Sequence, residues 1–109
     1  MIRSISAFGL FAAALSAAAQ SFVVPPELWD RPRSGRAMLE QPAIRQAVEA
    51  LLARPEARLV VHHGAGQEPA LLAEELRAWL AALAVDSARV ALRGDLKPSE
   101  PIRLEVIRD

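Results

Sequence analysis

The sequence predicts a small α/β sandwich in which one sheet carries two helices on one face. Three observations support this prediction. Strand-like and helix-like segments follow one another in the order β-α-β-α-β-β, both helical segments carry an apolar stripe, and residues 102–107 alternate between apolar and charged side chains. Strands that alternate with helices indicate a sheet packed against helices around one core.

Residues 1–19 have the three parts of a secretory signal peptide. Met-Ile-Arg supplies a positive start, residues 5–15 form an apolar middle, and Ala17–Ala19 before Gln20 fits the small-x-small rule for cleavage. The apolar middle is shorter than the roughly 20 residues of a membrane span. We therefore expect cleavage after residue 19 and a mature chain without a transmembrane span. A retained N-terminal anchor is the alternative.

The composition after residue 19 excludes two classes of small exported protein. The chain has 13 basic and 13 acidic residues, and loss of Arg3 leaves a slight acidic excess, whereas nucleic-acid binders normally carry a basic excess or stripe. It has no Cys, so no disulfide framework supports the fold, which must rest on an apolar core. Lys97 is the single lysine among the 13 basic residues, and such a preference for arginine over lysine is typical of GC-rich bacterial genomes. We expect a bacterial domain that works in the periplasm.

Residues 20–35 are predicted to form a Pro-rich N-terminal arm or a first strand. Residues 22–24 are β-prone, and Pro25-Pro26 stops regular pairing. Trp29 is the main apolar residue of the stretch, and it either fills the core or contacts a partner. Phe22 and Trp29 are therefore the candidate partner-contact residues.

Two amphipathic helices are predicted, over residues 37–53 and 68–83. Pro42 interrupts the first pattern, so that helix can begin there with proline in its first turn, where a missing N–H costs nothing. Glu68 near the start of the second helix complements the helix dipole. The apolar stripes consist of Leu39, Ile44, Ala47, Val48, Leu51 and Leu52 in the first helix, and Leu72, Leu76, Trp79, Leu80 and Leu83 in the second.

Three further strands are predicted at residues 59–61, 89–92 and 102–107. The first of them leads into His62-His63-Gly64-Ala65-Gly66, which we expect to be a flexible loop. Gly94-Asp95 is expected to turn the chain after the second. The alternation in the last strand predicts that one of its faces is exposed.

Five segments in this order resemble the OmpA-like peptidoglycan-binding domain of bacterial envelopes, from about Ser34 to Ile107. Each segment alone is a weak signal, and their order and spacing carry the resemblance. The similar segments are the strand and loop 59–64 with His63 at the family histidine, the helix signature 72–78 with Arg77, the turn 84–90, Gly94 with Pro98, and the last strand 101–106 with Arg103 at the second family arginine.

The resemblance implies that a loop Asp and a helix Arg hold the diaminopimelate group of the peptidoglycan stem peptide. Arg77 stands at the Arg position, and a guanidinium suits a carboxylate. Ala65 falls near the Asp position, and Ile102 replaces the first family arginine. The acidic half of the ligand-binding pair is therefore absent, unless Glu68 or Asp95 takes the place of the loop Asp. The candidate ligand contacts are Arg77, His63, Gly64, Ala65, Gly66 and Arg103.

Two classes of function follow from these observations. The favoured class is a non-catalytic adaptor or accessory subunit that binds an envelope protein, because the loop acid is missing and the arm offers a docking segment. Peptidoglycan binding through Arg77 is the alternative, and a plain ion pair between Arg77 and Glu74 is the structural interpretation of that arginine. A small periplasmic enzyme is a remote third alternative.

Motifs for metal, nucleotide and nucleophile chemistry are incomplete. His62 and His63 are adjacent residues that leave a strand, so they point to opposite sides and joint chelation of one ion is awkward. We expect one buried and one exposed imidazole. Gly64-Ala65-Gly66 lacks the Gly-Lys-Ser/Thr of a phosphate loop and the third glycine of a dinucleotide fingerprint. There is no Gly-x-Ser-x-Gly elbow. We therefore expect no metal, no cofactor and no catalysis.

Overall fold

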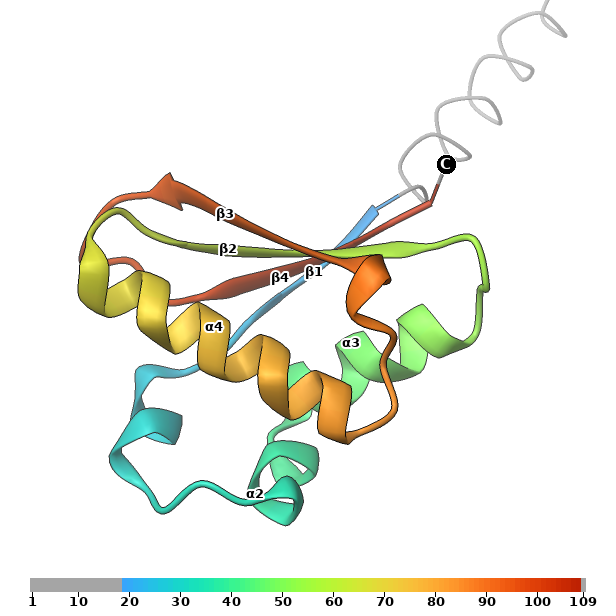
Figure 1. The fold of residues 1–109 in the computed structure, drawn as a ribbon, viewed down its shortest axis with the longest axis horizontal. Coiled ribbons are helices and arrows are strands. Elements are labelled where there is room, and N and C mark those ends of the chain that lie inside the picture. Colours follow the sequence, from blue (N-terminus) through green and yellow to red (C-terminus); the bar gives the residue numbers. More distant parts are fainter. Residues whose placement is uncertain (1–18, 109) are drawn as a thin grey trace, which may run out of the picture.

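The computed structural model describes residues 19–108, which form one four-stranded mixed sheet with the helices on one face (Figure 1). This confirms the predicted α/β sandwich and its β-α-β-α-β-β order. β2 is parallel to β3 and antiparallel to β4, which is itself antiparallel to β1. Across the sheet the strands are β1 (Ala19–Val23), β4 (Arg103–Ile107), β2 (Arg58–Gly64) and β3 (Val90–Leu96). The predicted signal peptide lies, except for Ala19, outside the described residues.

The helical layer contains α2 (Gly35–Glu40), α3 (Pro42–Leu52) and α4 (Gln67–Ala82), with short 3₁₀ turns η1 (Pro26–Asp30) and η2 (Ser87–Arg89). The predicted helix over 37–53 is thus two helices. Pro42 disfavours a helical conformation at Gln41, which is extended at φ −78° and ψ 116°. The Gln41 side chain then caps α3 by accepting a hydrogen bond from the Ala43 N–H at 3.2 Å. Among residues 19–108 no helix has the length and apolarity to cross a membrane.

The N-terminal arm is part of the fold. Phe22 of β1 pairs with Leu104 of β4, and the Val24 N–H donates to the Ile102 carbonyl at 2.8 Å. The chain then turns through η1, where Leu28 is buried and Trp29 packs partly against the core. The first strand predicted from residues 22–24 therefore joins the sheet as its edge.

Two segments predicted as loop and turn are strand. His62, His63 and Gly64 belong to β2, and Gly94 and Asp95 belong to β3. The two strands stay paired through a bulge, since the register shifts between His62 and Gly64. Gly64 permits this, because a Cβ there would lie 2.7 Å from the Lys97 carbonyl oxygen of the following loop.

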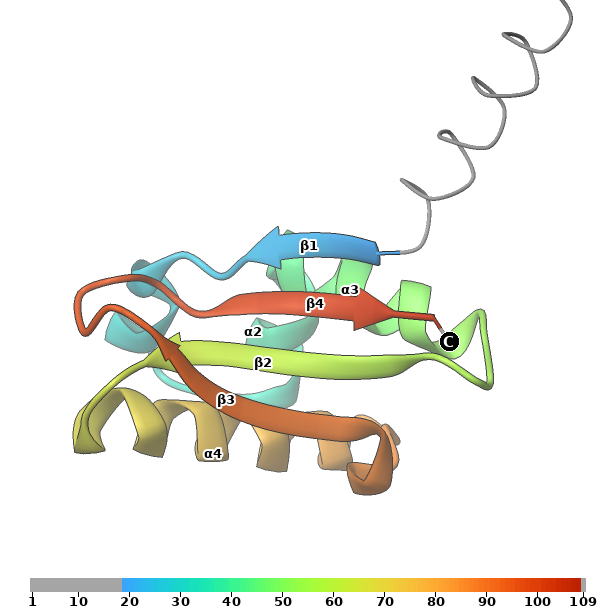
Figure 2. The ribbon, with the colours of Figure 1, turned by 90° about the horizontal axis from the view of Figure 1, so that it is seen from above.

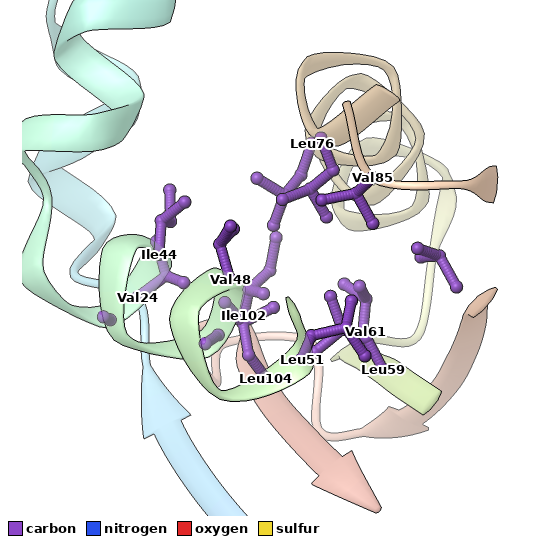
Figure 3. Packing of buried hydrophobic residues seen from close by; sticks show 14 of the residues in the cluster. Val24, Ile44, Val48, Leu51, Leu59, Val61, Leu76, Val85, Ile102 and Leu104 are labelled. Atoms are coloured by element: carbon purple, nitrogen blue, oxygen red, sulfur yellow. The ribbon is translucent and has the colours of Figure 1, made fainter. Parts of the chain in front are cut away.

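The core lies between the sheet and the helices (Figure 3). Alternate residues of β2 and β4 point toward the helices, and the apolar stripes of α3 and α4 cover them. The opposite face carries no helix in the described chain, as the view onto the sheet in Figure 2 shows; we call it the open face. The buried core side chains include Ile44, Val48, Leu51, Leu59, Val61, Leu76, Leu80, Leu104 and Val106.

Candidate functional site

A small hollow opens at the carboxyl end of β2, where the arm, α4 and the β3–β4 loop meet. Its volume is about 170 Å³. We call it the Trp29 hollow. Its walls are mostly apolar, and Glu68 and Glu100 add two carboxylates. The apolar lining includes Trp29, Leu72 and four prolines, Pro26, Pro69, Pro98 and Pro101.

Trp29 is held in place by a chain of contacts to α4. The Arg33 guanidinium lies 5.3 Å from the Trp29 ring centroid, a cation–π distance. Arg33 Nε is 3.2 Å from Glu75 Oε2, and the Trp79 indole N–H donates to the same oxygen at 3.1 Å. These contacts connect the arm to α4, so the position of Trp29 depends on a carboxylate remote in sequence.

The predicted ligand loop is ordered around backbone contacts. His63 is 9% exposed, and its Nδ1 donates to the Gly64 carbonyl at 2.9 Å. The Ala65 N–H donates to the Leu96 carbonyl at 3.1 Å, and Gly66 precedes α4 at φ 117°, a conformation that favours glycine. Of the predicted loop residues, Gly64 lines the Trp29 hollow directly.

Arg77 does not join this loop. Its Nη2 lies 3.2 Å from Glu74 Oε1, one helical turn earlier. At about 1.5 Å per residue, Arg77 stands roughly 15 Å along the axis of α4 from Gln67. Glu68 lines the Trp29 hollow, and Asp95 binds His62 on the open face. Neither acid therefore lies beside Arg77, where it would replace the missing Asp.

Two other predicted contacts lie elsewhere. Arg103 of β4 is the register partner of His62 on the open face. Phe22 lines a second hollow of about 570 Å³ between β1, β4 and α3, together with Gln46, Glu49 and Arg54. The structure therefore brings Gly64 and Trp29 together but separates both from Arg77, Arg103 and Phe22.

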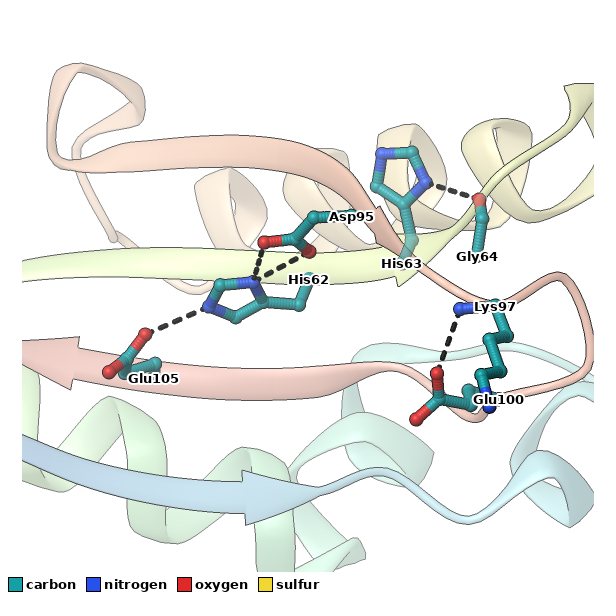
Figure 4. Close-up of polar contacts among 7 residues, drawn as sticks. All are labelled: His62, His63, Gly64, Asp95, Lys97, Glu100 and Glu105. Atoms are coloured by element: carbon teal, nitrogen blue, oxygen red, sulfur yellow. Dashed lines mark hydrogen bonds and ion pairs between the residues drawn. The ribbon is translucent and has the colours of Figure 1, made fainter.

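A polar cluster on the open face was missed by sequence reasoning (Figure 4). His62 is 5% exposed and lies between two carboxylates. Its Nδ1 is 2.9 Å and 3.0 Å from the two oxygens of Asp95, and its Nε2 is 2.8 Å from Glu105 Oε1. The expectation of one buried and one exposed imidazole is wrong, because β2 is a central strand and side chains from β3 and β4 cover His62.

The geometry of the cluster suits a doubly protonated ring. Each ring nitrogen faces a carboxylate, and hydrogen bonds at both require a proton on each when both acids are ionised. The hydrogen bond to His62 holds the pKa of the Asp95 carboxyl below its usual range, against the opposing effect of desolvation, and the charge of Arg103 adds to the lowering. Arg103 Nε is itself buried without a hydrogen-bond partner in the described chain.

The alternation of core-facing and outward-facing residues along β2 and β4 indicates part of this cluster. His62 follows core-facing Val61, and Glu105 lies between core-facing Leu104 and Val106, so both point to the open face. Asp95 was not predictable this way, because the bulge decides where its side chain lies. Within residues 19–108 no three His, Asp or Glu side chains are grouped to hold a metal ion.

Comparisons of the chain with family models, curated proteins and solved structures found no match. The resemblance to OmpA-like domains therefore stays a prediction drawn from the residues quoted above.

Proposed function

We propose that this chain is an exported, non-catalytic binding module of the bacterial periplasm. It acts as an envelope-associated adaptor or accessory subunit on an OmpA-like scaffold, and it binds a protein partner at the Trp29 hollow. The order and spacing of the five family-like segments support the scaffold. The signal-like residues 1–19 support export.

The observation that carries the proposal is the lining of the Trp29 hollow. Segments far apart in the sequence converge there on an aromatic ring and four prolines. Tryptophan is enriched among the residues that dominate binding energy at protein interfaces. Aromatic grooves also bind extended, proline-rich segments, whose backbone loses little entropy on docking. The hollow therefore suits an anchor side chain from an extended partner segment.

The size of the hollow limits the anchor to one side chain. Its volume of about 170 Å³ is close to that of a known apolar cavity of about 150 Å³ that accepts one benzene molecule. A leucine, proline or phenylalanine side chain fits this limit. Glu68 and Glu100 favour a basic residue next to the anchor.

The polar cluster supports a non-catalytic role. A histidine that acts as a general base needs a free ring nitrogen within reach of a substrate proton. Both nitrogens of His62 are hydrogen-bonded to carboxylates, so that ring offers no free nitrogen. His63 is buried, with its Nδ1 donating to the Gly64 carbonyl, and burial restricts the access of a substrate to its ring.

The first test is site-specific photo-crosslinking in the source bacterium. A benzophenone amino acid replaces Ser99 in the wall of the hollow, and exposed Arg36 on α2 is the control position. We expect one defined envelope protein to crosslink at position 99 and not at position 36. The purified partner should bind the parent domain and Trp29→Phe, but neither Trp29→Ala nor Pro101→Arg, which places a long side chain in the hollow from an exposed position.

Two results would reject the proposal. One is a partner that binds all four proteins equally while circular dichroism shows that each is folded. The other is sedimentation with purified peptidoglycan by the parent but not by Arg77→Ala, which would establish the cell-wall alternative. Export has a separate readout: mass spectrometry of the periplasmic protein should give a chain that begins at Gln20.

A further inference from the structure

The open face carries more positive than negative side chains. Arg58 on β2, Arg93 on β3 and Arg103 on β4 alternate with core-facing residues and so point away from the helices. The acids of this face are Asp95 and Glu105, and His62 binds both. Both acids therefore have an internal hydrogen-bond partner in His62.

Two of these arginines, Arg58 and Arg93, are exposed. Within residues 19–108, neither of them forms an ion pair with a carboxylate. By contrast, Arg89 donates to the carbonyls of Leu51, Arg54 and Ala57. Arg58 and Arg93 are thus available to an external carboxylate.

Arg58 and Arg93 both line a hollow of about 200 Å³. Its apolar lining includes Val60, Ala91 and Ile107, and Arg89, whose guanidinium is held by backbone carbonyls, also lines it. Arg58 lies four strand positions before His62, and His62 is the register partner of Arg93. At about 3.3 Å per residue the two arginine positions are about 13 Å apart along the strands.

We propose that this surface binds an extended acidic segment of a protein partner. In an extended chain, side chains at positions i, i+2 and i+4 share one side and span about 13 Å. Carboxylates at i and i+4 would then reach Arg58 and Arg93, while an apolar side chain at i+2 fills the hollow. A guanidinium holds a carboxylate through two parallel hydrogen bonds, which makes this spacing selective.

Charge complementarity selects this occupant. A second copy of the domain would bring a positive surplus against an identical positive surplus. The surface uses residues other than those of the Trp29 hollow, so it gives the domain a second docking site and does not depend on the proposed function.

The test measures binding of the mature chain to a synthetic peptide by isothermal titration calorimetry. The probe is acetyl-Thr-Glu-Thr-Val-Thr-Glu-Thr-amide, with glutamates at i and i+4 around a valine. A spacing control of equal composition is acetyl-Thr-Thr-Glu-Glu-Val-Thr-Thr-amide. We expect the probe to bind more tightly than the control, with an affinity that falls as salt rises. Arg58→Ala with Arg93→Ala should weaken binding about tenfold or more.

Matched substitutions separate this effect from loss of positive charge in general. Arg36→Ala with Arg45→Ala removes two exposed arginines from the helical layer and should leave binding unchanged. Because Arg58 and Arg93 are exposed, their variants should retain the parent's unfolding midpoint. Three outcomes would each overturn the proposal. The probe and the spacing control bind equally, both double variants weaken binding equally, or a phosphate-rich RNA oligomer binds more tightly than the probe.

Discussion

Nε2 of His62 lies 2.8 Å from Oε1 of Glu105, and this contact connects β2 to β4 across the open face. On the other side of the ring, Nδ1 connects β2 to β3 through Asp95. One buried imidazole therefore joins β2, β3 and β4 on the open face. The open face is held together by charge-assisted hydrogen bonds where the other face has an apolar core.

Removing one acid of this cluster should weaken the fold. Glu105→Ala leaves the buried Nε2 of His62 without its acceptor, and we expect a loss of about 1–3 kcal/mol in the free energy of unfolding. Urea denaturation measures it. Glu40→Ala is the control, because the exposed pair with Arg36 is worth at most about 0.5 kcal/mol. Equal losses in the two variants would show that the Glu105 contact adds nothing beyond a surface ion pair.

Acid should weaken the cluster through Asp95. The folded-state pKa of Asp95 lies below its usual value, so its ionised form stabilises the native state above the unfolded pKa of about 3.9. This contribution is lost as the pH falls through the lower folded-state pKa. We expect Asp95→Asn to have a lower Tm than the parent at pH 6, and the difference to shrink below about pH 4. A constant difference between pH 2 and pH 6 would contradict this assignment.

Gly64 should tolerate no side chain. A Cβ at Gly64 would lie 2.7 Å from the Lys97 carbonyl oxygen and 2.9 Å from that of Pro98, and both are backbone atoms of one loop. We expect Gly64→Ala to destabilise the domain by about 1–3 kcal/mol in urea denaturation. Gly35→Ala is the matched control, since its nearest neighbour would be a Leu83 methyl at 3.9 Å. That variant should be neutral or slightly more stable.

Arg89 should act through hydrogen bonds and not through charge alone. Its guanidinium donates to three carbonyls near the end of α3, those of Leu51 at 2.7 Å, Arg54 at 2.6 Å and Ala57 at 3.0 Å. Lysine has the charge but not the planar fork, so Arg89→Lys should lose much of what Arg89→Ala loses, about 1–3 kcal/mol. Thermal unfolding measures both variants. Full stability of Arg89→Lys would mean that charge alone suffices.

The sequence alone determined the layer structure and the order of its elements. The stripes of α3 and α4 and the alternation of β4 are local patterns, because a side chain's direction in a helix or strand follows from its position. Pro42 likewise predicted the start of α3, since proline restricts its own backbone and that of Gln41. The same patterns place His62 and Glu105 on one face.

The tertiary structure decided how distant residues meet. His62 is 33 positions from Asp95 and 43 from Glu105, and strand order and a bulge bring them together. Residues 62–64 read as a loop locally, yet pairing with β3 keeps them extended. The local sequence does not decide whether Trp29 fills the core or contacts a partner. In the structure Glu75 of α4 binds both Arg33 and Trp79, and Arg33 in turn lies over the Trp29 ring. Such contacts depend on register and packing between elements, whereas short-range periodicity specifies only the elements themselves.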